Sequence, residues 1–174
     1  GKEAYMAAEF LIRQKHEQIG YIAGSKGALE DRLQGFKKAL YDHNLAFDKN
    51  FVIENHSDDE KQCGYDGAKN LMAKGVTAII AGNEAVASGC YAAIQEALLK
   101  IPEDVSVITL GDSEICESLT PSLTSVAHPA HEMGFKACEM LLRLTRQKGG
   151  DIKMTFEPSV AVRGSVSAPK VADR

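Results

Sequence analysis

The sequence has no tryptophan, only 5 prolines in 174 residues, and no long hydrophobic run. Its longest apolar stretches, 76–82 and 105–110, are far shorter than the roughly 20 residues that a membrane-spanning helix needs. The chain opens on Gly1 with neither a basic start nor a hydrophobic segment, so no export signal is expected. We therefore expect no contact with a membrane and a location in the cytoplasm.

Positive charge is also scarce, because 20 lysines and arginines face 24 aspartates and glutamates, which gives a formal net charge of −4. No run of basic residues could neutralise a row of phosphates, so this chain by itself is not expected to bind nucleic acid. The cysteines form no CxxC pair, which favours free thiols in a reducing compartment over a disulfide framework. They are Cys63, Cys90, Cys116 and Cys138.

Strand-like and helix-like patterns alternate along the chain, which is long enough for one hydrophobic core. Between the apolar segments, apolar residues recur every three or four positions, as in the series from Leu29 to Leu40 and from Val86 to Leu98. This alternation predicts an α/β fold, a doubly wound, mostly parallel sheet with helices on both faces. Its ligand crevice should lie at the carboxyl ends of the strands. The segments typical of buried strands are 19–23, 51–53, 77–81, 105–110, 124–126 and part of 154–162.

Three polar residues near these strand ends are candidates for ligand binding. Arg32 offers the five fixed donors of a guanidinium to hydroxyls or an anion, or else it pairs with Glu30 or Asp31 on a helix surface. Asn83 carries both a donor and an acceptor, but an asparagine at the start of a helix also serves as its N-cap. Asp112 either accepts hydroxyl hydrogen bonds or is simply solvated.

Patterns for catalysis, cofactors and metals are missing. Gly24 and Gly27 follow a strand, but their spacing is neither GxGxxG nor a Walker loop, so a simple strand-to-helix turn is the better interpretation. His128 and His131 lie three residues apart without an obvious third ligand, so no metal is expected. Because no nucleophile elbow, catalytic triad or carboxylate pair can be identified, we predict that the chain is not an enzyme and uses no cofactor.

A series of motifs at characteristic gaps runs through almost the whole chain, from residue 7 to about residue 163. The motifs are Ala7-Ala8-Glu9-Phe10-Leu11-Ile12 with His16, Ile19-Gly20-Tyr21-Ile22 with Gly24, Arg32-Leu33-Gln34-Gly35-Phe36, Gly82-Asn83-Glu84, Ile101-Pro102-Glu103-Asp104-Val105 and Thr120-Pro121. In that order and with those gaps, the sequence resembles the LacI/GalR family of bacterial sugar-responsive repressors.

The resemblance implies a cytoplasmic transcription regulator in which effector binding in a cleft shifts the DNA affinity of a helix-turn-helix headpiece outside this chain. It implies that 17–127 and 158–165 build the C-terminal subdomain of a type I periplasmic-binding-protein-like core. Segments 1–16 and 128–148 would be remnants of the N-terminal subdomain, and 166–174 a tail. The alternative is an exported type I sugar-binding protein of a transport system.

The resemblance also implies roles for the candidate residues. Arg32 matches the arginine of the R-x-x-G-[FYW] motif, which binds effector hydroxyls or anionic groups. Asn83 matches the asparagine of the N-D motif, with Glu84 where aspartate is usual. Gly111 stands where the family usually has a hydroxyl-accepting acid, which leaves its neighbour Asp112 as a substitute. The expected effector is a sugar or a sugar phosphate, bound by Arg32, Asn83 and Asp112.

Finally, the resemblance implies a homodimer through the helix after Asn83 and the loop after the fourth strand. Operator DNA would be a partner only through the headpiece. The predicted interface residues are Val86, Ser88, Tyr91, Cys116 and Leu119, with a place in the core as the alternative for several of them.

Overall fold

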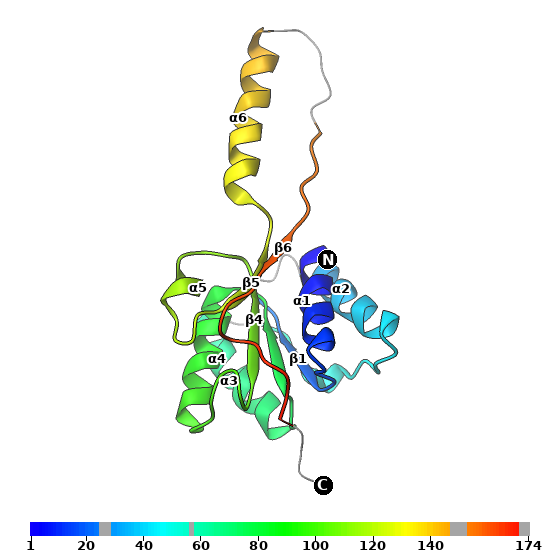
Figure 1. Cartoon of the computed structure of the whole chain (residues 1–174), viewed down its shortest axis with the longest axis vertical. Coiled ribbons are helices and arrows are strands. Elements are labelled where there is room, and N and C mark those ends of the chain that lie inside the picture. Colours follow the sequence, from blue (N-terminus) through cyan, green and yellow to red (C-terminus); the bar gives the residue numbers. More distant parts are fainter. Residues whose placement is uncertain (25–28, 56–57, 147–152, 171–174) are drawn as a thin grey trace.

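The computed structural model describes residues 1–24, 29–55, 58–146 and 153–170, and this part of the chain contains a six-stranded sheet. The strand order is β2-β1-β3-β4-β5-β6, in which only the β5–β6 pair is antiparallel (Figure 1). The predicted doubly wound, mostly parallel α/β sheet is thereby confirmed. The strands are β1 Ile19–Ile22, β2 Val52–Ile53, β3 Ala78–Ala81, β4 Ser106–Leu110, β5 Thr124–Ala127 and β6 Ser159–Ala161.

Helices cover both faces of this sheet (Figure 1). Because successive side chains of a strand point to opposite faces, Ile79 packs in the layer of α3 and α4, whereas Ile80 packs in the layer of α1 and α2. The helices are α1 Lys2–Arg13, α2 Leu29–Asp42, α3 Glu60–Ala73, α4 Glu84–Glu96, α5 Ile115–Ser118 and α6 Ala130–Arg146, with a 3-10 turn at Lys49–Phe51.

The helical series that begins at Val86 ends earlier than its spacing predicts. Val86, Cys90 and Ile94 are fully buried, but Leu98 is 90% exposed. Helix α4 ends at Glu96, and Leu98 has a φ of +57°, which turns the chain away from the helix axis. The stripe therefore contributes one residue fewer to the core.

Helix α1 packs on this sheet, so the predicted boundary at residue 16 is wrong. Its Ala4, Ala7, Ala8 and Leu11 are all fully buried, in the same cluster as core residues of α2, β3 and β4. Small side chains at helical spacing let α1 approach its neighbours closely. Residues 1–16 therefore pack with the sheet and are not a remnant that lacks one.

The segment after β6 packs against the sheet, so it is not a free tail that starts at residue 166. Ser165 is fully buried and its carbonyl accepts a hydrogen bond from Val107 N at 2.9 Å, and Lys170 forms an ion pair with Asp104. This segment lies beside the start of β4, on the edge opposite β3, because β5 pairs only with Ile108–Leu110. Residues 171–174 of the predicted tail lie outside the described residues.

One buried polar residue ties three distant parts of this body together. His16 is 1% exposed, and its Nδ1 lies 2.8 Å from Thr77 Oγ1 while its Nε2 donates to Ser167 O at 2.8 Å. Burial lowers the pKa of His16 below its usual 6.5, and the hydrogen bond to Ser167 only partly opposes this. The histidine is therefore held in its neutral form.

We expect the free energy of unfolding to fall as the pH is lowered from about 6.5, because the unfolded chain then binds a proton that the folded state resists. The melting temperature measured between pH 7.5 and 5.5 should drop in the wild type, and this drop should become smaller in His16→Gln. His131→Gln, at an exposed histidine, is the matched control and should keep the wild-type slope. An identical slope in His16→Gln would show that other groups cause the acid sensitivity.

Candidate functional site

Five polar side chains meet at the carboxyl ends of β1, β3 and β4, where the topology places a ligand crevice. We call this group the strand-end cluster. It contains the three residues predicted from the sequence and two that were not predicted as site residues. Its members are Glu3, Arg32, Asn83, Glu84 and Asp112.

Arg32 points from α2 towards the end of β3. Its Nη1 donates to Gly82 O at 2.9 Å, and its Nη2 lies 3.7 Å from Glu3 Oε2. Only 22% of its side chain is exposed, and it pairs with neither Glu30 nor Asp31, the partners of a solvated helix arginine. The guanidinium is therefore fixed at the predicted crevice.

Asn83 fulfils the N-cap role that the sequence left open. Its Oδ1 accepts from Val86 N at 2.9 Å, which satisfies a free amide in the first turn of α4. Its Nδ2 faces the end of β1, where a Cβ on Gly24 would come within 2.7 Å of it. Capping thus occupies the oxygen, and the amide nitrogen remains as a donor at the strand ends.

Asp112 lies at the surface and is anchored there by two partners. Its Oδ1 accepts from Ser125 Oγ and from Arg163 Nη2, both at 2.8 Å. Arg163, whose side chain is 17% exposed, also donates to Leu123 O. The charge of Asp112 is therefore neutralised, and Arg163 is a structural partner that no motif spacing in the sequence indicated.

Glu84 spans the gap between the ends of β3 and β4. Its Oε1 accepts from Ser113 N at 2.9 Å, and both carboxylate oxygens lie 2.9 Å from where a Cβ on Gly111 would be. Gly111 has a φ of +110°, a backbone conformation that favours glycine. The carboxylate of Glu84 thus lies over the backbone at the strand end.

Glu3 connects the cluster to the segment that leads into α6. Its two carboxylate oxygens lie 3.7 Å from Arg32 and 3.8 Å from His128, and 18% of its side chain is exposed. A hollow of about 440 Å³ beside this segment is lined by Asp112, Ser125, His128 and His131, among others. Among the described residues, no group of three or more metal-type side chains is arranged to hold an ion.

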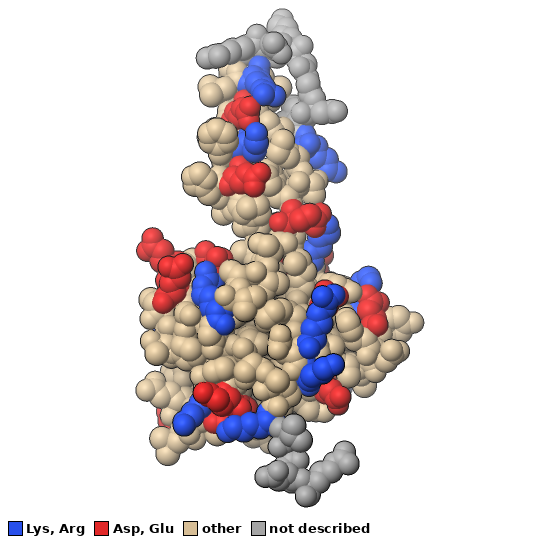
Figure 2. All heavy atoms as spheres, in the orientation of Figure 1, with Lys and Arg blue, Asp and Glu red and all other residues tan. Residues whose placement is uncertain are grey.

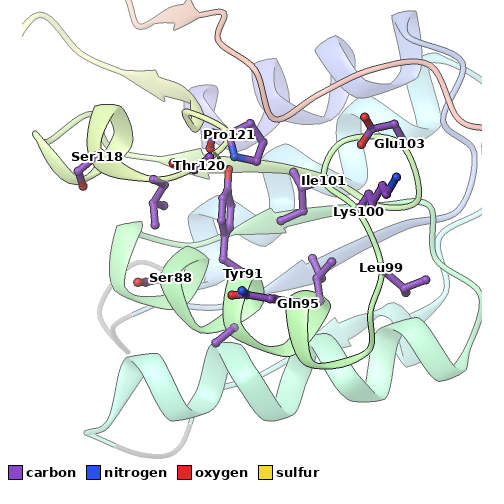
Figure 3. A pocket seen from close by; sticks show the side chains of 13 residues that line it. Ser88, Tyr91, Gln95, Leu99, Lys100, Ile101, Glu103, Ser118, Thr120 and Pro121 are labelled. Carbon is purple, nitrogen blue, oxygen red and sulfur yellow. Dashed lines mark hydrogen bonds between the residues drawn. The ribbon is translucent and has the colours of Figure 1, made fainter.

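A larger hollow, of about 680 Å³, lies along α4 and not at the strand ends. Figure 3 shows Tyr91 rising from α4 between Ser88 and Gln95 towards Pro121, whose carbonyl accepts from the tyrosine hydroxyl at 2.9 Å. Burial raises the pKa of Tyr91. Because Tyr91 braces the loop after α5, this wall of the hollow is held in place.

Three of the five predicted interface residues, Ser88, Tyr91 and Leu119, line this hollow. Val86 and Cys116 do not, because both are fully buried core residues, which is the alternative that the sequence left open for several of the five. Burial, and secondarily the charge of Glu84, raises the pKa of the Cys116 thiol to about 11. Cys116 is therefore an inert core residue.

Helix α6 extends away from the sheet (Figure 1), and several of its apolar residues are exposed. Phe135 is 64% exposed, Leu141 62% and Leu142 59%. Charged side chains of both signs follow one another along the helix in Figure 2. Among the charged residues of α6, Glu139 pairs with Lys136 and Arg143. The helix is amphipathic, and its apolar side has no partner among the described residues.

The chain matches a protein family over most of its length. Residues 8–166 match the family described as periplasmic binding protein-like domain. The ribose operon repressor of Haemophilus influenzae is 32% identical over 171 residues, which cover 95% of this chain and 51% of that protein. These matches bear out the resemblance predicted from the motifs.

Two solved structures share the fold. The Escherichia coli transcriptional repressor ascG superimposes with a TM-score of 0.85 at 29% identity, covering 95% of this chain and 61% of that one. A LacI family transcriptional regulator from Enterococcus faecium with bound ribose gives 0.83 at 26% identity, covering 97% and 63%. The chain spans about half the length of the ribose operon repressor that it matches. In the described part of the chain, no helix combines the length and apolar character that crossing a membrane requires.

Proposed function

We propose, from the premise that this chain belongs to the periplasmic binding protein-like domain family, that it is the effector-binding and dimerisation core of a sugar-responsive LacI-type transcription regulator. The observation that carries the proposal is the strand-end cluster. Arg32, Asn83 and Glu84 present donors and acceptors at the switch point of a doubly wound sheet, where such folds bind ligands. None of these groups is paired with a nucleophile or general base, which argues against an enzyme.

The effector contacts this cluster on one side and a second subdomain on the other. Helix α6 is our evidence for the second subdomain, because a soluble protein rarely leaves several large apolar side chains of one helix, such as Phe135, Leu141 and Leu142, uncovered. We assign residues 128–146 to it; residues 147 and 148 of the predicted segment lie outside the described residues. An effector that binds the closed arrangement of the two subdomains more tightly shifts the population towards it, and thereby the DNA affinity of a headpiece.

We assign the hollow along α4 to contact with a second copy of the chain. It combines apolar walls from Leu99, Ile101 and Leu119 with the hydroxyls of Ser88 and Thr120, a composition typical of protein interfaces. A two-fold axis beside α4 would place the same hollow of each copy against the other. The regulator acts in the cytoplasm, as a dimer.

The full-length protein should melt at a higher temperature in the presence of its sugar and should change its affinity for operator DNA. Ligand at 100 times its Kd adds about 2.7 kcal/mol to the free energy of unfolding, a shift of several degrees. D-ribose is the first sugar to test, because two similar proteins carry it in their names or structures. Thermal melting with and without sugars, followed by fluorescence anisotropy on labelled operator, measures both effects.

Residues 1–174 alone are the control for DNA binding and should not shift the operator in a low-salt gel. The exported sugar-binding protein, the alternative considered from the sequence, is not favoured, because the similar proteins are transcriptional repressors. Such a protein would bind sugar without changing the affinity of any protein for operator DNA. Sequence upstream of this chain also separates the two, since a helix-turn-helix supports the regulator and a hydrophobic export segment supports the transport protein.

A further inference from the structure

The carboxylate of Glu84 occupies the place that a side chain at position 111 would take. A Cβ on Gly111 would lie 2.9 Å from Oε1 and 2.9 Å from Oε2 of Glu84, closer than ordinary contact allows. Glycine at 111, with its φ of +110°, leaves this space empty, and the longer side chain from the first residue of α4 reaches into it. An acidic group thus stands at the end of β4, supplied from the neighbouring strand end.

This carboxylate has acceptor capacity left for a ligand. A carboxylate accepts about four hydrogen bonds, and Glu84 accepts one, from Ser113 N to Oε1. No cation among the described residues forms an ion pair with it, and its side chain is partly exposed. Asp112, by contrast, already accepts from Ser125 and Arg163. Glu84 is therefore the better acceptor of the two at this strand end.

The charges of the cluster do not cancel. Glu3 faces Arg32, and Asp112 faces Arg163, but the negative charge of Glu84 has no such partner in the part of the chain that the structure describes. Its field also reaches Cys116, whose pKa it raises in addition to the effect of burial. An anionic group that entered next to Gly111 would meet this unneutralised charge at short range, whereas a hydroxyl would donate a hydrogen bond to it.

We propose that Glu84 is a specificity-determining residue that accepts hydroxyl hydrogen bonds from the effector, and that the effector is an uncharged sugar rather than a sugar phosphate. This inference rests on the proposed function and names the ligand class of the same crevice. It narrows the sequence-based expectation, which allowed either kind of sugar. It also transfers the role of acidic acceptor from Asp112 to Glu84.

The test compares a neutral sugar with its phosphate ester on the full-length protein. Calorimetric titrations use D-ribose with D-ribose 5-phosphate, and D-glucose with D-glucose 6-phosphate. The wild type should bind a neutral sugar at least about tenfold more tightly than its ester. Glu84→Gln should weaken binding of the neutral sugar roughly ten- to hundredfold, as expected for the loss of a hydrogen bond to a charged group, and should narrow its advantage over the ester.

Two further variants test whether the position of the Glu84 carboxylate matters as well as its charge, and whether removing any carboxylate of this loop has the same effect. Glu84→Asp keeps the charge but withdraws the carboxylate by one methylene, so it should lose as much sugar affinity as Glu84→Gln. Glu114→Gln removes an exposed carboxylate of the same loop and should leave all affinities unchanged. Glutamine retains an acceptor oxygen for Ser113 N, so the melting temperature of Glu84→Gln should match that of the wild type.

Each outcome supports or overturns the proposal. Unchanged sugar affinity in Glu84→Gln, or tighter binding of the phosphate esters by the wild type, overturns the role of Glu84 while the regulator function stands. If the wild type binds neither the sugars nor the esters and its operator affinity does not respond to them, the proposed function fails and this inference fails with it.

Discussion

Arg32→Ala in the full-length protein is expected to raise the Kd for the effector about ten- to thousandfold and to change the melting temperature little. The guanidinium has five donors, of which the bond to Gly82 O uses one. The others are held at the strand ends, partly shielded, with 22% of the side chain exposed. Each charge-assisted bond is worth about 1.5–3 kcal/mol, and 1.4 kcal/mol is a factor of ten, so losing one or two accounts for that range.

The structure adds a second reason for a large effect. Glu3 Oε2 lies 3.7 Å from Arg32 Nη2. Without Arg32, the carboxylate of Glu3 would lose this ion pair and the crevice would become more negative. Arg32→Lys keeps a charge but not the planar fork, so its Kd should lie between those of the wild type and Arg32→Ala. Calorimetric titration with D-ribose compares the three proteins.

Arg13→Ala is the matched control, since Arg13 is 69% exposed on α1 and pairs only with Glu9. Its Kd should equal that of the wild type. If Arg32→Ala also bound with the wild-type Kd, the guanidinium would be a brace between Gly82 and Glu3 and not a ligand contact.

Local sequence patterns predicted the main helices and strands, but they could not predict against which sheet or subdomain a helix packs. The alternation of apolar segments predicted the parallel sheet because buried strands and amphipathic helices have different periods. The spacing of Ala4, Ala8 and Leu11 shows that α1 has an apolar face, and any partner with a complementary surface would satisfy it. The assignment of residues 1–16 to another subdomain failed for that reason.

In the candidate site, too, the residues could be predicted from the sequence but their contact partners could not. Strand ends are visible in the sequence, so Arg32, Asn83 and Asp112 could be named in advance. Their partners could not, because the ion pair of Asp112 with Arg163 joins residues 51 positions apart through the antiparallel β6. Val86 was predicted at an interface although its own spacing with Cys90 and Ile94 marks the core face of α4. The spacing of Val86, Cys90 and Ile94 predicted a buried position for Val86, whereas the family resemblance implied an interface position.

Ser88→Arg is expected to convert the dimer into a monomer. Ser88 lies on α4 and lines the hollow (Figure 3), and a two-fold contact would bring the two copies of this position close together. Two arginines facing each other in a partly dehydrated contact repel at a cost of several kcal/mol, enough to raise the dimer Kd more than a hundredfold. Tyr91 is unsuitable for this test, because its hydroxyl braces Pro121 and its replacement would disturb the loop.

Light scattering coupled to gel filtration at about ten micromolar protein should then give half the wild-type mass. Gln34→Arg introduces the same charge on the exposed surface of α2, on the opposite face of the sheet, and should remain dimeric. The melting temperature of Ser88→Arg, measured at the same concentration, should fall only by the part that association contributes. Retention of the dimer mass by Ser88→Arg would place the two-fold contact away from α4, and the hollow would then lose its assigned partner.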